Sequence, residues 1–146
     1  YIVHIPYRGA GPALADTVGG QVSMIFDNLP STLPFVKDGK LVPIVIAAPK
    51  RLAQLPNVPT FSEVGLAPVN RMAYYGLLGP AGIPKDIVEK YYAALKVVVS
   101  DPAVKKRIEE TGSIINVNGP EAFSKEIKAE YAVYKEVVAK QKLALD

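Results

Sequence analysis

The stretch Tyr7 to Val22, YRGAGPALADTVGGQV, places glycine and proline just ahead of a short helical segment. A helix N-terminus leaves its first N–H groups unpaired and carries partial positive charge, so it attracts anions. Gly11 would let a ligand approach the backbone closely, and Pro12 suits the first helical position. The stretch therefore predicts an anion site, and an ordinary connection from a loop into a helix is the alternative.

A carboxylate fits this stretch better than a phosphate, because the lysine and hydroxyl of a phosphate-binding loop are missing. The candidate N–H donors are those of Gly9, Ala10, Gly11, Ala13 and Leu14, with Arg8 adding charge and Tyr7 adding a hydroxyl or a ring wall. Asp27 and Asn28 form a second candidate group, because they follow an apolar segment at the strand end where open α/β sheets bind ligands. A helix cap or a turn explains this pair equally well.

Groups for catalysis or metal binding are scarce. His4 is the only histidine, and its apolar surroundings favour a structural role over that of a general base. The carboxylates of Asp101, Glu109 and Glu110 belong to a charged helical segment, where a solvated face is the simplest explanation. Nucleophile-elbow and phosphate-loop motifs are absent, and Leu14 stands where a dinucleotide fingerprint needs its third glycine. We expect no catalytic residue, no metal site and no cofactor.

Composition describes one ordinary folded domain rather than a disordered or fibrous chain. The 146 residues are 49% hydrophobic and 21% charged. The net charge of +3 comes from Lys and Arg interspersed with Glu, so we expect no nucleic-acid partner. Apolar runs are too short for a membrane span, which needs about 20 residues. With no cysteine, the redox compartment stays undetermined.

The elements that would position the candidate site alternate along the first half of the chain. We expect strands over residues 1–7, 22–26, 42–48 and 74–80, and helices over 12–19 and 30–38. This order is typical of a parallel α/β sheet. The Pro-rich connection 51–70 holds Thr60 and Glu63 at capping-box spacing, which predicts one short helix.

The second half reads as helix. Helices are expected over residues 84–99, from Pro102 with Asp101 as its cap to Gly112, and from about Pro120 onward. The last helix is amphipathic, and its apolar face is Phe123, Ile127, Tyr131, Tyr134 and Val138. Packing in a core is the expected role of its tyrosines. Near Asn70 the sequence changes from segments punctuated by Pro and Gly to helical patterns, and we expect this change to mark the passage between two lobes.

Several stretches together resemble the Bug/TctC family, the extracytoplasmic receptors of tripartite tricarboxylate transporters. They are VHIPYRGAGPALADTVGGQVSMIFDNLPSTLPFVKDGKLVPI, LPNVPTFSEVG, YYGLLGPAGIP and SDPAVKKRIEETG, which together span essentially the whole chain in the family's order. Three positions depart from the pattern: Tyr75 stands where Trp is usual, and Pro43 and Pro49 interrupt a smoother strand.

The resemblance implies a periplasmic binding protein of type II, with parallel-rich sheets and two lobes that close on a small carboxylate. It implies transport without chemistry or cofactor, in the periplasm, with membrane transporter subunits as partners. Residues 1–70 would belong to the second lobe, and 71–146 would return to complete the first. The resemblance assigns ligand contacts to Tyr7, Gly9, Ala10, Gly11, Pro12 and Ala13, with Arg8 where Lys is commoner and Asp16 as a local brace.

The resemblance also bears on length, because family members are about twice as long as this chain. The chain then corresponds to a C-terminal part, whose uncovered apolar surface would promote self-association or exchange of elements between chains. Two other functions stay open: a ligand-sensing module of a signalling system, and an enzyme acting on a carboxylate, for which no acid or base is evident.

Overall fold

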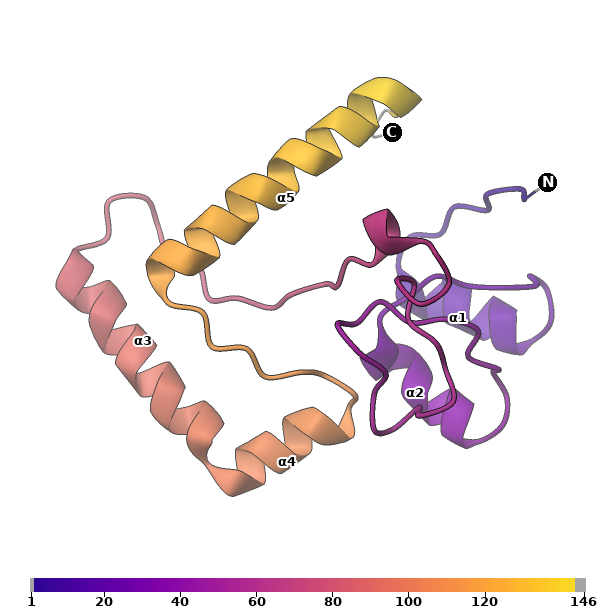
Figure 1. The fold of residues 1–146 in the computed structure, drawn as a ribbon, viewed down its shortest axis with the longest axis horizontal. Coiled ribbons are helices and arrows are strands. Elements are labelled where there is room, and N and C mark those ends of the chain that lie inside the picture. Colours follow the sequence, from indigo (N-terminus) through magenta and orange to yellow (C-terminus); the bar gives the residue numbers. More distant parts are fainter. Residues whose placement is uncertain (1, 144–146) are drawn as a thin grey trace. The chain divides into compact units, whose positions relative to one another are not determined.

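The computed structural model describes residues 2–143, in which helices are joined by long extended stretches (Figure 1). The helices are α1 (Ala10–Val18), α2 (Leu29–Lys37), the short 3-10 helix η1 (Ala67–Val69), α3 (Lys85–Ser100), α4 (Pro102–Glu110) and α5 (Pro120–Gln141). Each of the five longer helices predicted from sequence is present. Among these residues, no helix combines the length and the apolar character that crossing a membrane requires.

The first helix begins earlier than the sequence predicts. α1 starts at Ala10 rather than at Pro12, because the chain already turns at Gly9. Gly9 is the N-cap, with φ 131° and ψ 171°, a conformation essentially reserved for glycine. This conformation lets the extended segment before Gly9 enter the helix directly, and it puts Gly11 inside the first turn.

The predicted signals at both ends of α4 are confirmed. Asp101 Oδ1 accepts hydrogen bonds from the N–H groups of Ala103 at 2.8 Å and Val104 at 3.1 Å. This is the usual way in which an aspartate satisfies unpaired donors at a helix start. Gly112 follows the helix with φ 84°, a left-handed conformation that suits glycine at a helix end.

The capping box between Thr60 and Glu63 forms, but it does not start a helix. Glu63 Oε2 accepts the Thr60 N–H at 2.8 Å, and Thr60 Oγ1 accepts the Glu63 N–H at 3.3 Å. Residues 61–65 nevertheless form turns, because Gly65 takes a left-handed conformation with φ 80° and stops further helical bonding. The predicted short helix is therefore wrong at this place, and η1 is the short helix of this connection.

The predicted strands are extended but do not pair into a sheet. Across residues 2–143 there is a single isolated parallel bridge, between Ile46 and Thr60. It consists of the Ile46 N–H donating to the Pro59 carbonyl and the Phe61 N–H donating to the Ile46 carbonyl, both at 3.0 Å. Tyr1, at the start of the first predicted strand, lies outside the described residues. The prediction of paired strands is wrong for the described residues, because the bridge between Ile46 and Thr60 is the one pairing that forms among them.

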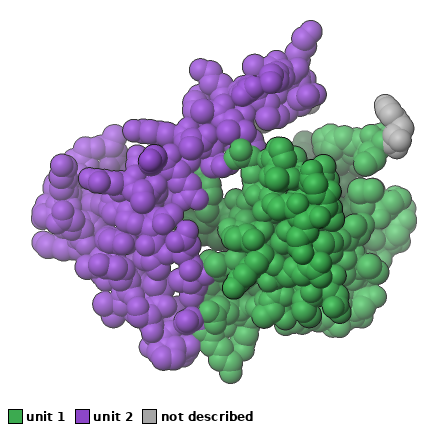
Figure 2. Space-filling model, viewed as in Figure 1, with its two compact units in different colours: residues 1–77, 106–114 green, residues 78–105, 115–146 purple. Residues whose placement is uncertain are grey.

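Two compact units divide the chain (Figure 2). Unit 1 holds residues 1–77 and 106–114, and unit 2 holds residues 78–105 and 115–146. The predicted division into lobes at residues 1–70 and 71–146 is a separate matter and stays a prediction.

The core of unit 1 is small. Leu33 of α2 is buried together with Leu55 and Val58 of the Pro-rich connection, and Leu29, Val36 and Ile46 pack around them. A side-chain amide adds a polar tie: Asn70 Nδ2 donates to the Ala48 carbonyl at 2.9 Å, while Asn70 Oδ1 accepts the Ala48 N–H at 3.1 Å. Asn70 thus pairs with Ala48 as a neighbouring strand would.

In unit 2, the expected core face of α5 is only partly covered. Phe123 and Ile127 are half-buried, but Tyr131 is 67% exposed and Tyr134 is 55% exposed. The prediction that these tyrosines pack in a core is therefore wrong within unit 2. The helix is amphipathic, but no described element of its unit covers its second half.

Candidate functional site

The turn at Gly9 sets which backbone donors face the solvent. In a helix that begins at Ala10, the N–H groups of Gly9, Ala10 and Gly11 have no acceptor within the helix, and Pro12 has no N–H. These three donors are exposed and make no backbone hydrogen bond to other described residues. The N–H of Ala13 is the first that the helix itself can satisfy. The geometry therefore favours a narrower donor set than the sequence analysis, and Ala13 would contribute contact through its methyl group.

Tyr7 is fixed against α1. Its hydroxyl donates to Asp16 Oδ2 at 2.7 Å, which confirms the predicted bracing role of Asp16. This hydrogen bond, followed by partial burial and by the carboxylate charge, raises the pKa of Tyr7 above its ordinary value. Because the one hydroxyl proton is already used, Tyr7 can offer a ligand its ring or an oxygen lone pair, but not a hydrogen-bond donor.

Arg8 adds positive charge beside the free donors. Its guanidinium is exposed and forms no ion pair with any residue of the described part. The first turn of α1 contains no acidic residue, and Asp16, the nearby carboxylate, lies later in the helix and accepts the Tyr7 hydroxyl. Charge and helix dipole thus act in the same direction, and both favour an anion at this turn.

Asp27 and Asn28 differ in whether their side chains make a local hydrogen bond. Asp27 Oδ2 accepts the hydroxyl proton of Ser31 at 2.6 Å, which is a local turn contact. Asn28 is the N-cap of α2 by position, yet its exposed side chain makes no capping hydrogen bond. The Asn28 amide is therefore the member of the pair that is available to a ligand. α1 and α2 contact each other, and both helices belong to unit 1.

Sequence analysis does not name Ser31 as part of this group. The signal for it was present, because Ser31 lies four residues after Asp27, a spacing that brings side chains together around a helix start. Of the residues offered for catalysis, His4 is exposed. The described residues hold no group of three His, Asp or Glu side chains able to bind a metal ion.

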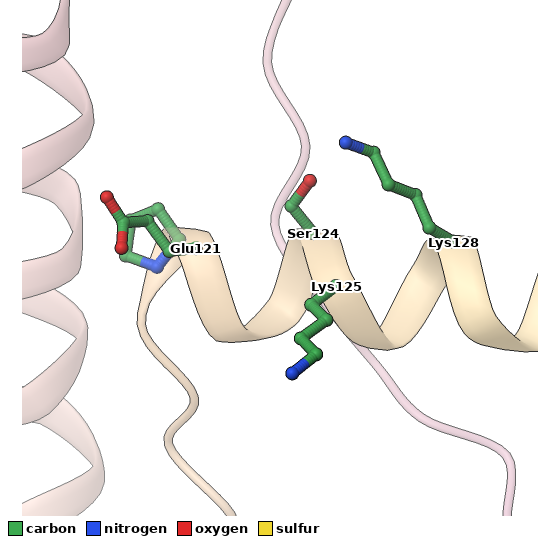
Figure 3. Close-up of a pocket in the computed structure, with 5 residues that line it drawn as sticks. Glu121, Ser124, Lys125 and Lys128 are labelled. Carbon is green, nitrogen blue, oxygen red and sulfur yellow. The ribbon is translucent and has the colours of Figure 1, made fainter.

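An open hollow lies on the first turns of α5 in unit 2, away from every predicted site residue in the sequence. Its lining is Pro120, Glu121, Ser124, Lys125 and Lys128. Figure 3 shows that the labelled side chains leave this one helix in different directions and do not converge. A ligand there would be enclosed by no second element, so the turn at Gly9 is the stronger candidate.

Comparison with known proteins identifies a family that this chain matches. Residues 1–143 match the sequence profile of the tripartite tricarboxylate transporter family receptor, TctC. A protein of Agrobacterium vitis, described as the UPF0065 protein in the TAR-I ttuE-ttuC' intergenic region, is 32% identical over 132 residues, which are 88% of this chain and 38% of the relative. Protein BugT of Bordetella pertussis is 35% identical over 85 residues, which are 58% of this chain and 26% of BugT.

Two solved structures are similar to this fold. The periplasmic binding protein BugD matches with a TM-score of 0.79 and 29% identity, over 93% of this chain and 46% of BugD. The R. palustris protein Rpa4515, solved with adipate, matches with a TM-score of 0.83 and 25% identity, over 96% of this chain and 47% of Rpa4515.

The chain spans less than half the length of these relatives and neighbours. Its fold class is that of the neighbours, the α/β periplasmic binding proteins, of which it forms a part. The matched family and BugD are described as receptors and binding proteins, not as enzymes. The chain belongs to the TctC family, the receptors of tripartite tricarboxylate transporters.

Proposed function

We propose that this chain is part of a periplasmic receptor that captures a small carboxylate and delivers it to a tripartite tricarboxylate transporter. The observation that carries the proposal is the turn at Gly9, which leaves three exposed N–H groups at the start of α1 beside the unpaired Arg8. Membership of the receptor family supports the transport role and the membrane partners.

The chemistry of the turn suits a carboxylate. Two carboxylate oxygens can accept hydrogen bonds from adjacent backbone donors, and bonds to a charged acceptor are stronger than neutral ones. The N–H groups of Gly9, Ala10 and Gly11 are such donors, and Arg8 supplies long-range attraction. The ring of Tyr7, held in place by Asp16, is the wall of the site. Small side chains at Ala10 and Ala13 leave room for the ligand to reach the backbone.

Among carboxylates, a linear dicarboxylate is favoured. Rpa4515 was solved with adipate, and its chain follows this one closely. The two carboxylates of adipate are separated by a flexible apolar chain, so a receptor needs two polar anchors. The turn at Gly9 is one anchor, and the uncommitted amide of Asn28 is a donor for a second contact, with Asp27 shaping its turn.

A calorimetric and thermal-shift titration with adipate tests the proposal, with adipamide as the uncharged probe of equal length. Ligand at about 100 times Kd should stabilise the protein by roughly 2.7 kcal/mol. We expect adipate to raise the melting temperature and adipamide to leave it unchanged. Equal effects of both compounds, or no effect of adipate on either this chain or a family receptor that contains it, would contradict an anion site at Gly9.

A further inference from the structure

Asn118 and Gly119 lie in the extended segment of unit 2 that leads into α5 (Figure 1). They form the one Asn–Gly pair of the sequence, since a larger residue follows each of Asn28, Asn57, Asn70 and Asn116. A glycine after an asparagine has no side chain to shield its backbone nitrogen from the asparagine amide, and its backbone turns freely. The pair is therefore a candidate site of spontaneous deamidation.

The reaction needs only this pair and water. The Gly119 nitrogen attacks Cγ of Asn118, so that a new N–C bond forms and the bond from Cγ to Nδ2 breaks. Nδ2 leaves as ammonia and carries away the proton of the Gly119 N–H, which gives a cyclic imide. One water molecule then opens the ring at either carbonyl. The products are aspartate, or isoaspartate in which the main chain runs through the former side chain.

The attacking nitrogen of Gly119 is available. Among the described residues, the Gly119 N–H donates to no backbone carbonyl. The Gly119 carbonyl accepts the N–H of Phe123 at 2.9 Å, as expected for the N-cap of α5. The residue is thus held at the start of the helix on its carbonyl side, while its nitrogen stays without such a partner.

The side chain of Asn118 is restrained by α5. Its Nδ2 donates to Glu126 Oε2 at 2.8 Å, and both residues are half-buried. Hydrogen bonds to a charged acceptor are stronger than neutral ones. The bond holds the nitrogen that must leave and limits the rotation that brings Cγ to the Gly119 nitrogen. Glu126 therefore slows the reaction in the folded protein.

Conversion would reverse the contact that now restrains Asn118. An amide donates hydrogen bonds, whereas a carboxylate only accepts them, so the product would set a second carboxylate against Glu126. Isoaspartate would also lengthen the main chain beside Val117, whose carbonyl lies 3.5 Å from the Tyr92 hydroxyl of α3. Both products weaken the junction between α3, this segment and the first turns of α5.

We propose that Asn118 is a deamidation site of this protein, that its hydrogen bond to Glu126 sets the rate, and that conversion loosens the start of α5. The inference is independent of the proposed ligand, because the residues involved belong to unit 2 and the turn at Gly9 belongs to unit 1.

Peptide mapping by mass spectrometry, during incubation in mildly alkaline buffer, tests the site and its rate. We expect Asn118 to convert before every other asparagine, including the exposed Asn116. Glu126→Ala should convert about fivefold faster in the native state, the factor expected for the loss of one net hydrogen bond. Glu121→Ala is the matched control on the same helix, because Glu121 is not the acceptor of the Asn118 amide. In urea, all three proteins should convert at the same rate.

Gly119→Ala tests the attack itself. Gly119 has φ −69° and ψ 167°, which suits any residue, and an added Cβ would lie at an ordinary contact distance of 3.5 Å from the Tyr92 ring. The variant should keep its melting temperature and lose the conversion. Equal native rates in the wild-type chain and Glu126→Ala, undiminished conversion in Gly119→Ala, or earlier conversion of another asparagine would overturn the proposal.

Asn118→Asp, which mimics one product, tests the loosening of α5. We expect its melting temperature to fall by a few degrees. The same change should cost less in a Glu126→Gln background, because the glutamine amide can donate to the new carboxylate. Equal losses in the two backgrounds, or no loss in either, would show that conversion leaves the start of α5 intact and would overturn that part of the proposal.

Discussion

Tyr7 and Asp16 are joined by a hydrogen bond of 2.7 Å that ties the extended segment before Gly9 to the middle of α1. The bond spans the turn that exposes the N–H groups of Gly9, Ala10 and Gly11. It therefore fixes the angle at which the chain enters the helix, and it occupies the one hydrogen-bond donor of the Tyr7 hydroxyl. The same contact stabilises the turn and limits what Tyr7 can offer a ligand.

Replacing Tyr7 by Phe should lower the free energy of unfolding, because the hydrogen bond to Asp16 is lost. Adipate binding should change little, since the ring persists. Urea unfolding and calorimetry measure the two effects. Asp16→Asn is the matched variant: it keeps an acceptor oxygen, so its stability loss should be smaller than that of Tyr7→Phe. A large loss of adipate affinity in Tyr7→Phe would show that the hydroxyl contacts the ligand.

The Tyr7–Asp16 pair also has a pH dependence of defined sign. The pKa of Tyr7 is raised above 10.0, chiefly by the hydrogen bond to Asp16. A raised pKa in the folded state means that the contribution of Tyr7 is complete below 10.0 and disappears as the pH rises through the folded value. Ultraviolet titration of the phenol should show the raised pKa in the native chain and a value nearer 10.0 in Asp16→Asn. An unchanged titration in that variant would contradict the contact.

Glu63 provides the opposite case at acid pH. Its pKa is lowered from 4.5, first by the hydrogen bond from the Thr60 N–H and then by the bond from Arg51. The stabilising contribution is therefore present above 4.5 and disappears as the pH falls through the lower folded value. Glu63→Gln can still accept the Thr60 N–H but does not titrate. Melting temperatures between about pH 3 and pH 7 should fall less steeply in Glu63→Gln, and parallel curves would contradict this role.

Gly112, two residues after the end of α4, lies close to Leu29 of α2 within unit 1. Its φ of 84° strains any other residue, and an added Cβ would lie 3.0 Å from Leu29 Cγ. Gly112→Ala should therefore cost about 2–4 kcal/mol, from backbone strain and overpacking together. Gly20→Ala is the matched control, since Gly20 has φ 77° but nothing within 4 Å of its Cβ position. It should cost about 1 kcal/mol from strain alone. Equal losses in urea unfolding would show that Leu29 moves away freely.

Local signals in the sequence were enough to predict the five longer helices. Asp101 and Pro102 start α4 where their chemistry predicts, because a cap needs only the residues within three positions of it. The start of α1 moved to Ala10 because the conformation of Gly9 depends on the preceding segment as well as on the helix. Sequence spacing likewise gave the contacts of the box between Thr60 and Glu63, but not the turn at Gly65 that stops a helix from following.

The strands could not be predicted in this way. Apolar alternation around Val42 and Ile44 identifies extended chain, but pairing depends on a neighbour that the described residues do not provide. The tyrosines of α5 make the same point: the spacing of Tyr131 and Tyr134 gives an apolar face, while its cover depends on another part of the protein. At the candidate site, the sequence indicated the donors and the charge, and the structure was needed to see that Asp16 accepts the hydrogen bond of the Tyr7 hydroxyl.

The proposed carboxylate site can be separated from the stability of α1 by two glycine substitutions. Gly9 has φ 131° and ψ 171°, so Gly9→Ala should distort the turn and abolish the adipate response. Gly11 lies inside the first turn of α1, where alanine is favoured over glycine by up to about 1 kcal/mol. Gly11→Ala should therefore raise the melting temperature while its methyl group weakens adipate binding. Stability and affinity then move in opposite directions, which a merely structural role for the turn does not produce. Adipate binding that survives Gly9→Ala would place the carboxylate elsewhere in the protein.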